Sequence, residues 1–243
     1  MSDFATLYIV DGALFVLVAF SVLTWTLILL KTYVHWRLAS ENRRFAAFFW
    51  KTAERDLTGA LGGQSQAASS SKARIARAGY AALSSARPVE ADSRTEFSKW
   101  DRQEVLERFL GQQIQRERRD LERGLTLLAS IANVAPFVGL FGTVFGIIHA
   151  LHALAAGPTG GVEAIAGPVG QALVATGVGI AVAIPAVLAY NFFLRRLRVT
   201  VADLDEYASD LVNLIRSHEF RITLAADARV QTSLPSRADE VLA

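Results

Sequence analysis

The chain has 243 residues, and its 25 Lys and Arg against 23 Asp and Glu leave a formal net charge of +2. All of the basic residues fall within residues 31–123 and 195–237, while residues 1–30 and 124–194 contain none. A soluble domain needs charged side chains over its whole surface, so this segregation excludes an ordinary soluble protein. The basic residues are interleaved with acidic ones, which argues against a nucleic-acid-binding protein. The chain has no cysteine, which excludes thiolate metal sites and a cysteine nucleophile.

Three uncharged stretches predict three transmembrane helices. Residues 12–30 form a run of 19 residues without a formal charge, close to the length of about 20 that a span needs. Residues 124–162 and 164–194 form uncharged runs of 39 and 31 residues, and each is long enough to cross a bilayer. Basic residues follow the first run, precede the second and follow the third. The positive-inside rule therefore predicts an outer N-terminus and a cytoplasmic C-terminus, without contradiction among the three runs.

These boundaries predict an all-α integral membrane helical bundle with long cytoplasmic helical extensions. Its expected parts are a first transmembrane helix over 1–36, a cytoplasmic helical region over 37–123, a transmembrane hairpin over 124–194, a cytoplasmic helical extension over 195–222 and a polar tail over 223–243. The polar tail is expected to be disordered. A short outer segment near residues 157–163, rich in Gly and Pro, is expected to form the turn of the hairpin.

Apolar periodicity predicts two cytoplasmic helices, over residues 37–57 and 72–86. Residues 59–71 between them are rich in Gly, Ser, Gln and Ala, which predicts a flexible connection. Residues 93–96, Ser-Arg-Thr-Glu, have the form of a capping box. Nothing after them stops a helix, so we expect one helix from about Thr95 into the second span.

The third span is expected to continue as a helix over 165–218, about 80 Å long at 1.5 Å per residue. Its apolar residues beyond the membrane follow an a/d pattern: Leu194, Leu197, Val201, Leu204, Ala208, Leu211 and Ile215. This stripe fits two interpretations, packing on the core of the same chain or packing between subunits. Because one chain cannot bury helices of this length, we expect homo-oligomerisation.

The second and third spans each carry a stripe of small residues on one helix face. The stripes consist of Pro136, Gly139, Thr143, Gly146, Ala150 and Ala153, and of Ala172, Thr176, Gly179, Ala183 and Ala186. Close helix packing in lipid accounts for the Gly and Ala. Thr143 and Thr176 each lie about 16 residues from the turn, so the hairpin places them at nearly the same depth. Their hydroxyls either bond their own helix carbonyls or, if these faces line a lumen, form a polar ring.

The second and third spans contain no deeply placed charged residue, because Glu163 lies at their shared end. An ion-coupled membrane protein usually needs a titratable group within the membrane, so that group would have to come from another subunit. His149 and His152 are three residues apart, and we interpret them as an interfacial pair without a metal rather than as a metal or proton-relay site. No acid–base pair or nucleophile converges at one depth, so neither an enzyme nor a cofactor is expected.

Two motifs carry a resemblance to a known family. Residues 135–147, APFVGLFGTVFGI, resemble the second-span signature of the MotA/TolQ/ExbB proton-channel family, and residues 171–186, QALVATGVGIAVAIPA, resemble its third-span signature. The helix-packing positions within them are Pro136, Gly139, Gly142, Gly146, Gly179, Ala183 and Pro185. The match is close over residues 124–195. Three spans point to the ExbB or TolQ branch, since MotA has a fourth, and residues 22–25, VLTW, favour ExbB.

The resemblance implies a homopentamer in the bacterial inner membrane, with the second and third spans around a lumen. That lumen would hold the single transmembrane helices of ExbD, and the assembly would work with TonB. Proton flow would energise outer-membrane uptake of iron-siderophore complexes, haem and cobalamin. In the family, Thr143 and Thr176 match lumen-facing threonines near the partner's transmembrane aspartate. The alternatives are a TolQ-like role in envelope maintenance and a passive helical membrane scaffold.

Gln171 departs from the family pattern, which usually has Glu at this position. A neutral amide cannot accept a proton there, although it can hydrogen-bond across an interface or to a partner helix. We therefore expect the titrating group of the channel to belong wholly to the partner subunit.

Overall fold

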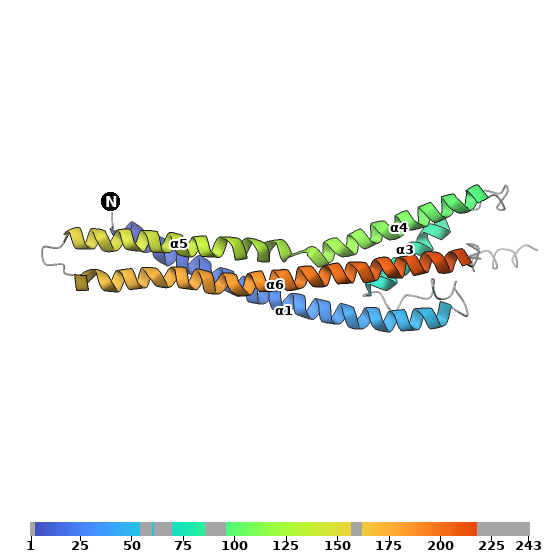
Figure 1. The fold of residues 1–243 in the computed structure, drawn as a ribbon, viewed down its shortest axis with the longest axis horizontal. Helices are drawn as coiled ribbons and strands as arrows, with labels where there is room; N and C mark the ends of the chain where they lie inside the picture. The colour runs from blue at the N-terminus through green and yellow to red at the C-terminus, as the bar shows by residue number, and fades with distance from the viewer. Residues whose placement is uncertain (1–2, 54–59, 61–69, 86–95, 157–161, 218–243) are drawn as a thin grey trace, which may run out of the picture. The chain divides into compact units, whose positions relative to one another are not determined.

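The computed structural model describes residues 3–53, 60, 70–85, 96–156 and 162–217, which contain helices and no strand. The helices are α1 (Asp3–Ala53), α3 (Ser71–Ser85), α4 (Glu96–Glu122), α5 (Leu125–Ala156) and α6 (Val162–Ser217) (Figure 1). They divide into two compact units. Unit 1 comprises the described parts of residues 1–35 and 121–198, and unit 2 those of residues 36–120 and 199–243.

Among the residues that the structure describes, three helical stretches are long and apolar enough to cross a membrane, judged by length and composition. They are Tyr8–Ala53, Arg102–His152 and Ala166–Ser217, and their apolar parts coincide with the three uncharged runs. For the described residues, the expectation of an all-helical fold with three helices suited to membrane spanning is therefore confirmed.

Two helix boundaries differ from the sequence predictions. The first span and the predicted helix over residues 37–57 form one continuous helix, α1, because no Gly or Pro separates them. The single helix expected from Thr95 into the second span was wrong, since α4 ends at Glu122 and α5 begins at Leu125. Gly124 lies at the break with φ of +81°, a left-handed conformation that ends helices and that glycine adopts without strain.

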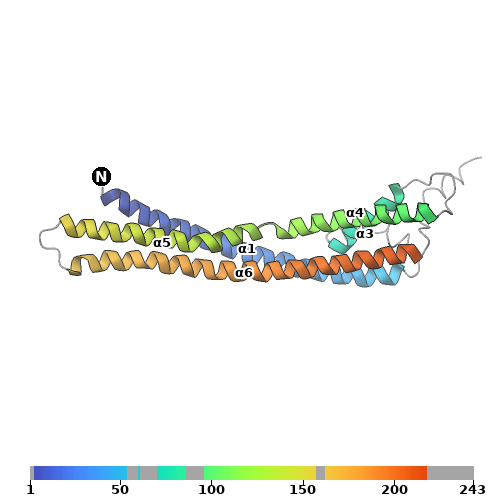
Figure 2. The same cartoon turned by 45° about the horizontal axis from the view of Figure 1, so that its top comes forward.

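Unit 1 is built on α5 and α6, which run antiparallel and side by side in both views (Figures 1 and 2). The membrane part of α1 packs on them through a core of Leu17, Ile131, Ala135, Val182, Ala183 and Ala186. Large apolar side chains still cover the outside of this unit, including Phe15, Phe137 and Leu188, each more than 60% exposed. Exposed apolar area of this extent needs lipid or another subunit to cover it.

Unit 2 has its own core, to which α1, α3, α4 and α6 contribute. The C-terminal part of the α6 apolar stripe belongs to this core, since Leu204, Ala208, Leu211 and Ile215 are all buried. Tyr207 lies in an aromatic cluster, with the rings of Phe49 and Trp50 centred 5.7 and 5.9 Å from its own. Of the two interpretations of the stripe, packing on the same chain is therefore the one that unit 2 shows.

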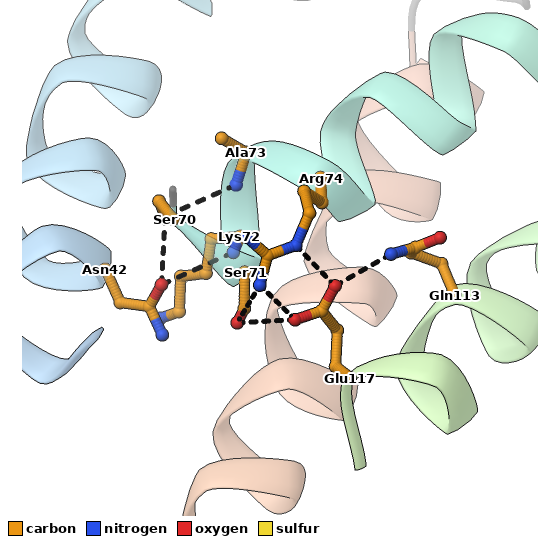
Figure 3. A network of polar contacts seen from close by, with 8 residues as sticks. All are labelled: Asn42, Ser70, Ser71, Lys72, Ala73, Arg74, Gln113 and Glu117. Atoms are coloured by element: carbon orange, nitrogen blue, oxygen red, sulfur yellow. Dashed lines mark hydrogen bonds and ion pairs between the residues drawn. The ribbon is translucent and has the colours of Figure 1, made fainter. Parts of the chain in front are cut away.

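The start of α3 is anchored to α1 through Asn42. The Asn42 Oδ1 accepts a hydrogen bond of 2.9 Å from the hydroxyl of Ser70 (Figure 3). The same Ser70 oxygen accepts a bond of 3.4 Å from the Ala73 amide, which is the contact expected of a helix N-cap. Ser70 and Ser71 are both buried. The predicted flexible connection over 59–71 is therefore wrong at this end, and its residues 59 and 61–69 lie outside the described residues.

A second polar contact joins α3 to α4 around the carboxylate of Glu117, which is 3% exposed. Glu117 accepts hydrogen bonds of 2.8 Å from Ser71, 2.6 Å from the Nε of Arg74 and 2.7 Å from Gln113, and the Arg74 Nη2 makes a further ion pair with it (Figure 3). Burial works against ionisation, but the bonds from Arg74 and Ser71 outweigh it and hold the pKa of Glu117 below its usual value. This ion pair fixes α3 on the α4 surface.

Three predictions fall on residues that the structure does not describe. The turn of the hairpin at residues 157–161, the capping-box residues 93–95 and the tail over 223–243 all lie outside the described ranges.

Candidate proton-pathway site

The small-residue stripes of α5 and α6 face each other within one chain. A Cβ added to Gly139 would lie 2.7 Å from the carbonyl oxygen of Ala175, and one added to Gly179 would lie 2.7 Å from the carbonyl oxygen of Ala135. Both distances are far below ordinary van der Waals contact, so only glycine allows this approach. The two backbones therefore touch at this level.

The close approach of α5 and α6 continues toward the C-terminal end of α5. A Cβ on Gly142 would lie 3.0 Å from the Ala175 Cβ, and one on Gly146 would lie 2.5 Å from the Ala172 Cβ. Gly142 also faces α1, since its Cβ would lie 3.4 Å from the Ala13 Cβ. The three helices of unit 1 thus meet where their side chains are smallest.

Thr143 and Thr176 lie directly opposite each other between α5 and α6. Their hydroxyl oxygens are 3.3 Å apart, which confirms the equal depth predicted from the hairpin. The Thr143 hydroxyl also bonds the Leu140 carbonyl oxygen at 2.7 Å. A hydroxyl has one proton, so Thr143 donates to Leu140 and Thr176 donates to Thr143. The pair forms a directed chain of two hydrogen bonds.

The two threonines differ in exposure. Thr143 is 6% exposed within the single chain, whereas Thr176 is half-buried. Thr176 is therefore the more accessible residue of the pair. The lone pairs of that oxygen can accept a hydrogen bond, because its proton is already directed at Thr143.

Gln171 is not brought into this pair. It is exposed, and it lies five residues before Thr176 on α6, about 7.5 Å away along the helix axis. Five residues turn a helix by about 140°, so Gln171 and Thr176 lie on different sides of α6. The structure thus brings together two of the three residues that the sequence singled out for the proton pathway.

The two histidines of this region differ in exposure. His149 is half-buried and His152 is exposed. In the part of the chain that the structure describes, no three His, Asp or Glu side chains are grouped so that they could hold a metal ion.

Lys31 is a buried residue, and the sequence indicated for it only a place on the cytoplasmic side of the first span. It is 7% exposed, and its Nζ donates a hydrogen bond of 2.6 Å to the carbonyl oxygen of Leu121 at the end of α4. A Cβ on Gly124 would lie 3.7 Å from the Cε of Lys31. The signal that could have indicated this site was an isolated glycine within a helical pattern, since such a residue often ends a helix.

Comparison with known proteins places these features in one family. Residues 67–206 match the MotA/TolQ/ExbB proton channel family. The chain belongs to that family. The match includes the helix break at Gly124, the glycine contacts and the threonine pair, and it ends within α6.

Its relatives in the MotA/TolQ/ExbB family carry two different names. A Biopolymer transport protein ExbB of Xanthomonas campestris is 36% identical over 210 residues, which cover 86% of this chain and 81% of that protein. One of Neisseria gonorrhoeae is 54% identical over 93 residues, or 38% of this chain and 42% of that protein. A Tol-Pal system protein TolQ of Haemophilus influenzae is 28% identical over 213 residues, or 87% of this chain and 91% of that protein. Family and helices together identify a multi-pass protein of the inner membrane.

Proposed function

We propose that this chain is the proton-channel subunit of an inner-membrane complex that uses the proton motive force to energise TonB-dependent transport across the outer membrane. The transported substrates would be iron-siderophore complexes, haem and cobalamin. The N-terminus lies in the periplasm and the C-terminus in the cytoplasm, as the basic residues beside the spans favour. ExbB-named relatives that cover most of the chain support this assignment.

The working assembly is a homopentamer whose second and third spans surround a lumen. An ExbD-like subunit places its transmembrane aspartate in that lumen, and a TonB-like protein carries the resulting motion outward. The need for a partner carboxylate is supported by the uncharged runs 124–162 and 164–194, which contain no Asp, Glu, Lys or Arg.

The hydrogen-bonded pair of Thr143 and Thr176 is the observation that carries the mechanism. The Thr176 oxygen can accept a hydrogen bond from a protonated partner carboxyl group. When that carboxyl ionises, rotation of the hydroxyl lets Thr176 donate to the carboxylate instead, while Thr143 keeps its bond to Leu140. Both protonation states of the partner are thereby stabilised at one position, which lowers the cost of proton transfer in the membrane.

The test replaces both hydroxyls by methyl groups of the same shape, with Thr143→Val and Thr176→Val combined. Energised uptake is expected to be lost while the oligomer, measured by native mass spectrometry, stays intact. The matched control combines Thr143→Ser and Thr176→Ser, which keeps the hydroxyls and should retain uptake. Wild-type uptake in the valine variant would contradict the role of the pair.

Gln171 has an accessory role in this proposal, as a hydrogen-bonding group on the exposed side of α6. Gln171→Ala should therefore reduce uptake only in part. Near-total loss of uptake with normal assembly would show that this amide is essential. Gln171→Glu, which restores the usual family residue, should leave assembly unchanged.

A second candidate function is that of a TolQ-like subunit of the Tol-Pal envelope-maintenance system, favoured by the TolQ relative that covers 87% of this chain. Complementation separates the two roles. The proposed function predicts rescue of an ExbB-deficient strain for siderophore uptake, and co-purification with an ExbD-like partner. Full activity after collapse of the proton gradient would instead indicate a passive scaffold.

A further inference from the structure

The outward side of α4 in unit 2 carries a face that mixes arginine and apolar side chains. Arg108 and Arg116 are exposed, and neither is paired with another described residue. Val105 and Phe109, beside them, are 39% and 40% exposed. Exposed apolar side chains mixed with arginine are typical of protein–protein interfaces rather than of a solvated helix face. This α4 face consists of Val105, Arg108, Phe109, Gln112 and Arg116, which lie on one side of the helix at 100° per residue.

The outward side of α6 in the same unit carries an acidic face. Glu206 and Asp210 are exposed and have no ion-pair partner among the described residues. Val199, on the same side of the helix, is 56% exposed. This α6 face consists of Val199, Ala202, Glu206, Asp210 and Asn213, which also lie on one side of the helix.

The two faces lie on different sides of the α4–α6 pair, and Asn213 at the edge of the α6 face lines the pocket between the two helices. On α4, the α4 face lies roughly opposite Leu110 and Ile114, which are buried toward α6. On α6, the α6 face lies roughly opposite Leu204 and Leu211, which are buried in the unit 2 core. The α4–α6 pair therefore has a positive side and a negative side. Like faces would repel each other, so two copies can associate favourably only with the α4 face of one on the α6 face of the next.

The charged residues of the two faces also lie at matching positions along the helix axes. Leu106 and Leu110 of α4 and Leu211 of α6 all reach within 3.5 Å of a Cβ placed on Gly79, so these residues share one level. The helices run antiparallel in this unit (Figures 1 and 2).

Asp210, next to Leu211, is therefore level with Arg108. Glu206 is five residues from Leu211, about 7.5 Å toward the C-terminal end of α4, which puts it within about one turn of Arg116. If neighbouring copies are related by a rotation about an axis parallel to the helices, each residue keeps its position along that axis. Arg108 can then meet Asp210 of the next copy while Arg116 meets Glu206.

We propose that neighbouring copies of this chain assemble head to tail through these faces, with Arg108 of one copy beside Asp210 of the next and Arg116 beside Glu206. Such an interface is heterologous, and its repetition closes into a ring. The inference rests on the proposed function for the existence of a ring of copies. It adds which surfaces meet outside the membrane and in which direction.

Cysteine cross-linking tests the direction of the contact, since the chain has no cysteine of its own. A short bismaleimide is added to membranes that contain the full-length protein. R108C/D210C should give a ladder of products up to the complete ring, and a co-expressed mixture of R108C and D210C should stop at dimers. R108C alone should give no dimer. The control R108C/R44C pairs the α4 face with an exposed residue of α1 and should give no ladder.

Charge reversal tests the chemistry of the contact. R108E and D210R should each lower the temperature at which the oligomer dissociates, and R108E/D210R should recover at least half of the combined loss. Losses that simply add in the double variant would overturn the proposal, as would dimers from R108C alone or an intact oligomer without a ladder. Uptake assays separate this result from the proposed function. Normal energised uptake without a ladder rejects only the interface, and a ladder in a protein that supports no uptake rejects only the function.

Discussion

The ammonium group of Lys31 donates a hydrogen bond of 2.6 Å to the carbonyl oxygen of Leu121, across 90 positions of sequence. The last carbonyls of a helix have no partner within the helix, and the partial negative charge of that end favours a cation. Lys31 supplies both the donor and the charge at the end of α4. One side chain of α1 thus caps the helix that stops just before Gly124.

Replacing Lys31 by methionine should destabilise this joint, because the stem stays packed while the donor and charge are lost. A hydrogen bond from a charged group contributes about 1.5–3 kcal/mol, so K31M should lower the thermal unfolding midpoint measurably. Hydrogen exchange should rise at residues 125–128, where the Leu128 amide bonds the Gly124 carbonyl. K31R keeps a donor and should retain most of the protection. Equal exchange in K31M and wild type would contradict the capping role.

Gly124→Ala should destabilise the protein by about 1–2 kcal/mol, because an L side chain is strained at a φ of +81°. Its Cβ would also crowd the Leu27 side chain, 3.3 Å away. Gly111 is the matched control, since it lies inside α4 with no atom within 4 Å of an added Cβ. G111A should stabilise by about 0.5–1 kcal/mol through helix propensity. The two unfolding midpoints should therefore move in opposite directions. Shifts of the same sign would show that the left-handed conformation at Gly124 does not require glycine.

Gly139→Ala should force α5 and α6 apart, because the new methyl would meet the Ala175 carbonyl oxygen at 2.7 Å. Overpacking of this kind costs about 1–3 kcal/mol, and it should also lengthen the Thr143–Thr176 contact. Energised uptake should fall together with stability. The control is G177A on α6, where no atom lies within 4 Å of an added Cβ. Wild-type stability in G139A would show that the two backbones can separate freely.

Acid should weaken the anchor of α3 through Glu117, whose pKa is lowered by its bonds to Arg74 and Ser71 against the effect of burial. A carboxyl with a depressed folded-state pKa stabilises fully above its unfolded value of about 4.3, and this contribution is lost as the pH falls below it. The unfolding midpoint of wild type should therefore drop more steeply between about pH 5 and pH 3 than that of E117Q. If the unfolding midpoints of wild type and E117Q fell equally with pH, the Glu117 carboxylate would not contribute to stability in this way.

The sequence predicted the features that depend on charge and on counting along helices. The three uncharged runs gave the three apolar helices, and the distance of Thr143 and Thr176 from the turn gave their equal depth. The helix break at Gly124 was missed because the residues around it are good helix formers. The break depends on the φ angle of this one residue, and only the packing of Gly124 against Leu27 and Lys31 fixes that angle. The interpretation of the α6 stripe stayed open because Leu204 and Leu211 would be apolar in either case.

The polar anchors of α3 were beyond sequence reasoning for a different reason. Asn42, Ser71 and Glu117 come from three separate segments, and nothing in their local patterns pairs them. Such contacts depend on tertiary structure, which brings distant segments to one place after their helices have formed.

The backbone contact between Gly139 and Gly179 has a consequence for ion permeation. Where a carbonyl oxygen of one helix occupies the space of a missing methyl group on the other, no water molecule can enter between them. A single copy is therefore sealed along the seam of its own hairpin at this level. Any conductance must therefore run over the outer surface of the hairpin, so a single copy in a lipid bilayer should carry no leak current through its hairpin.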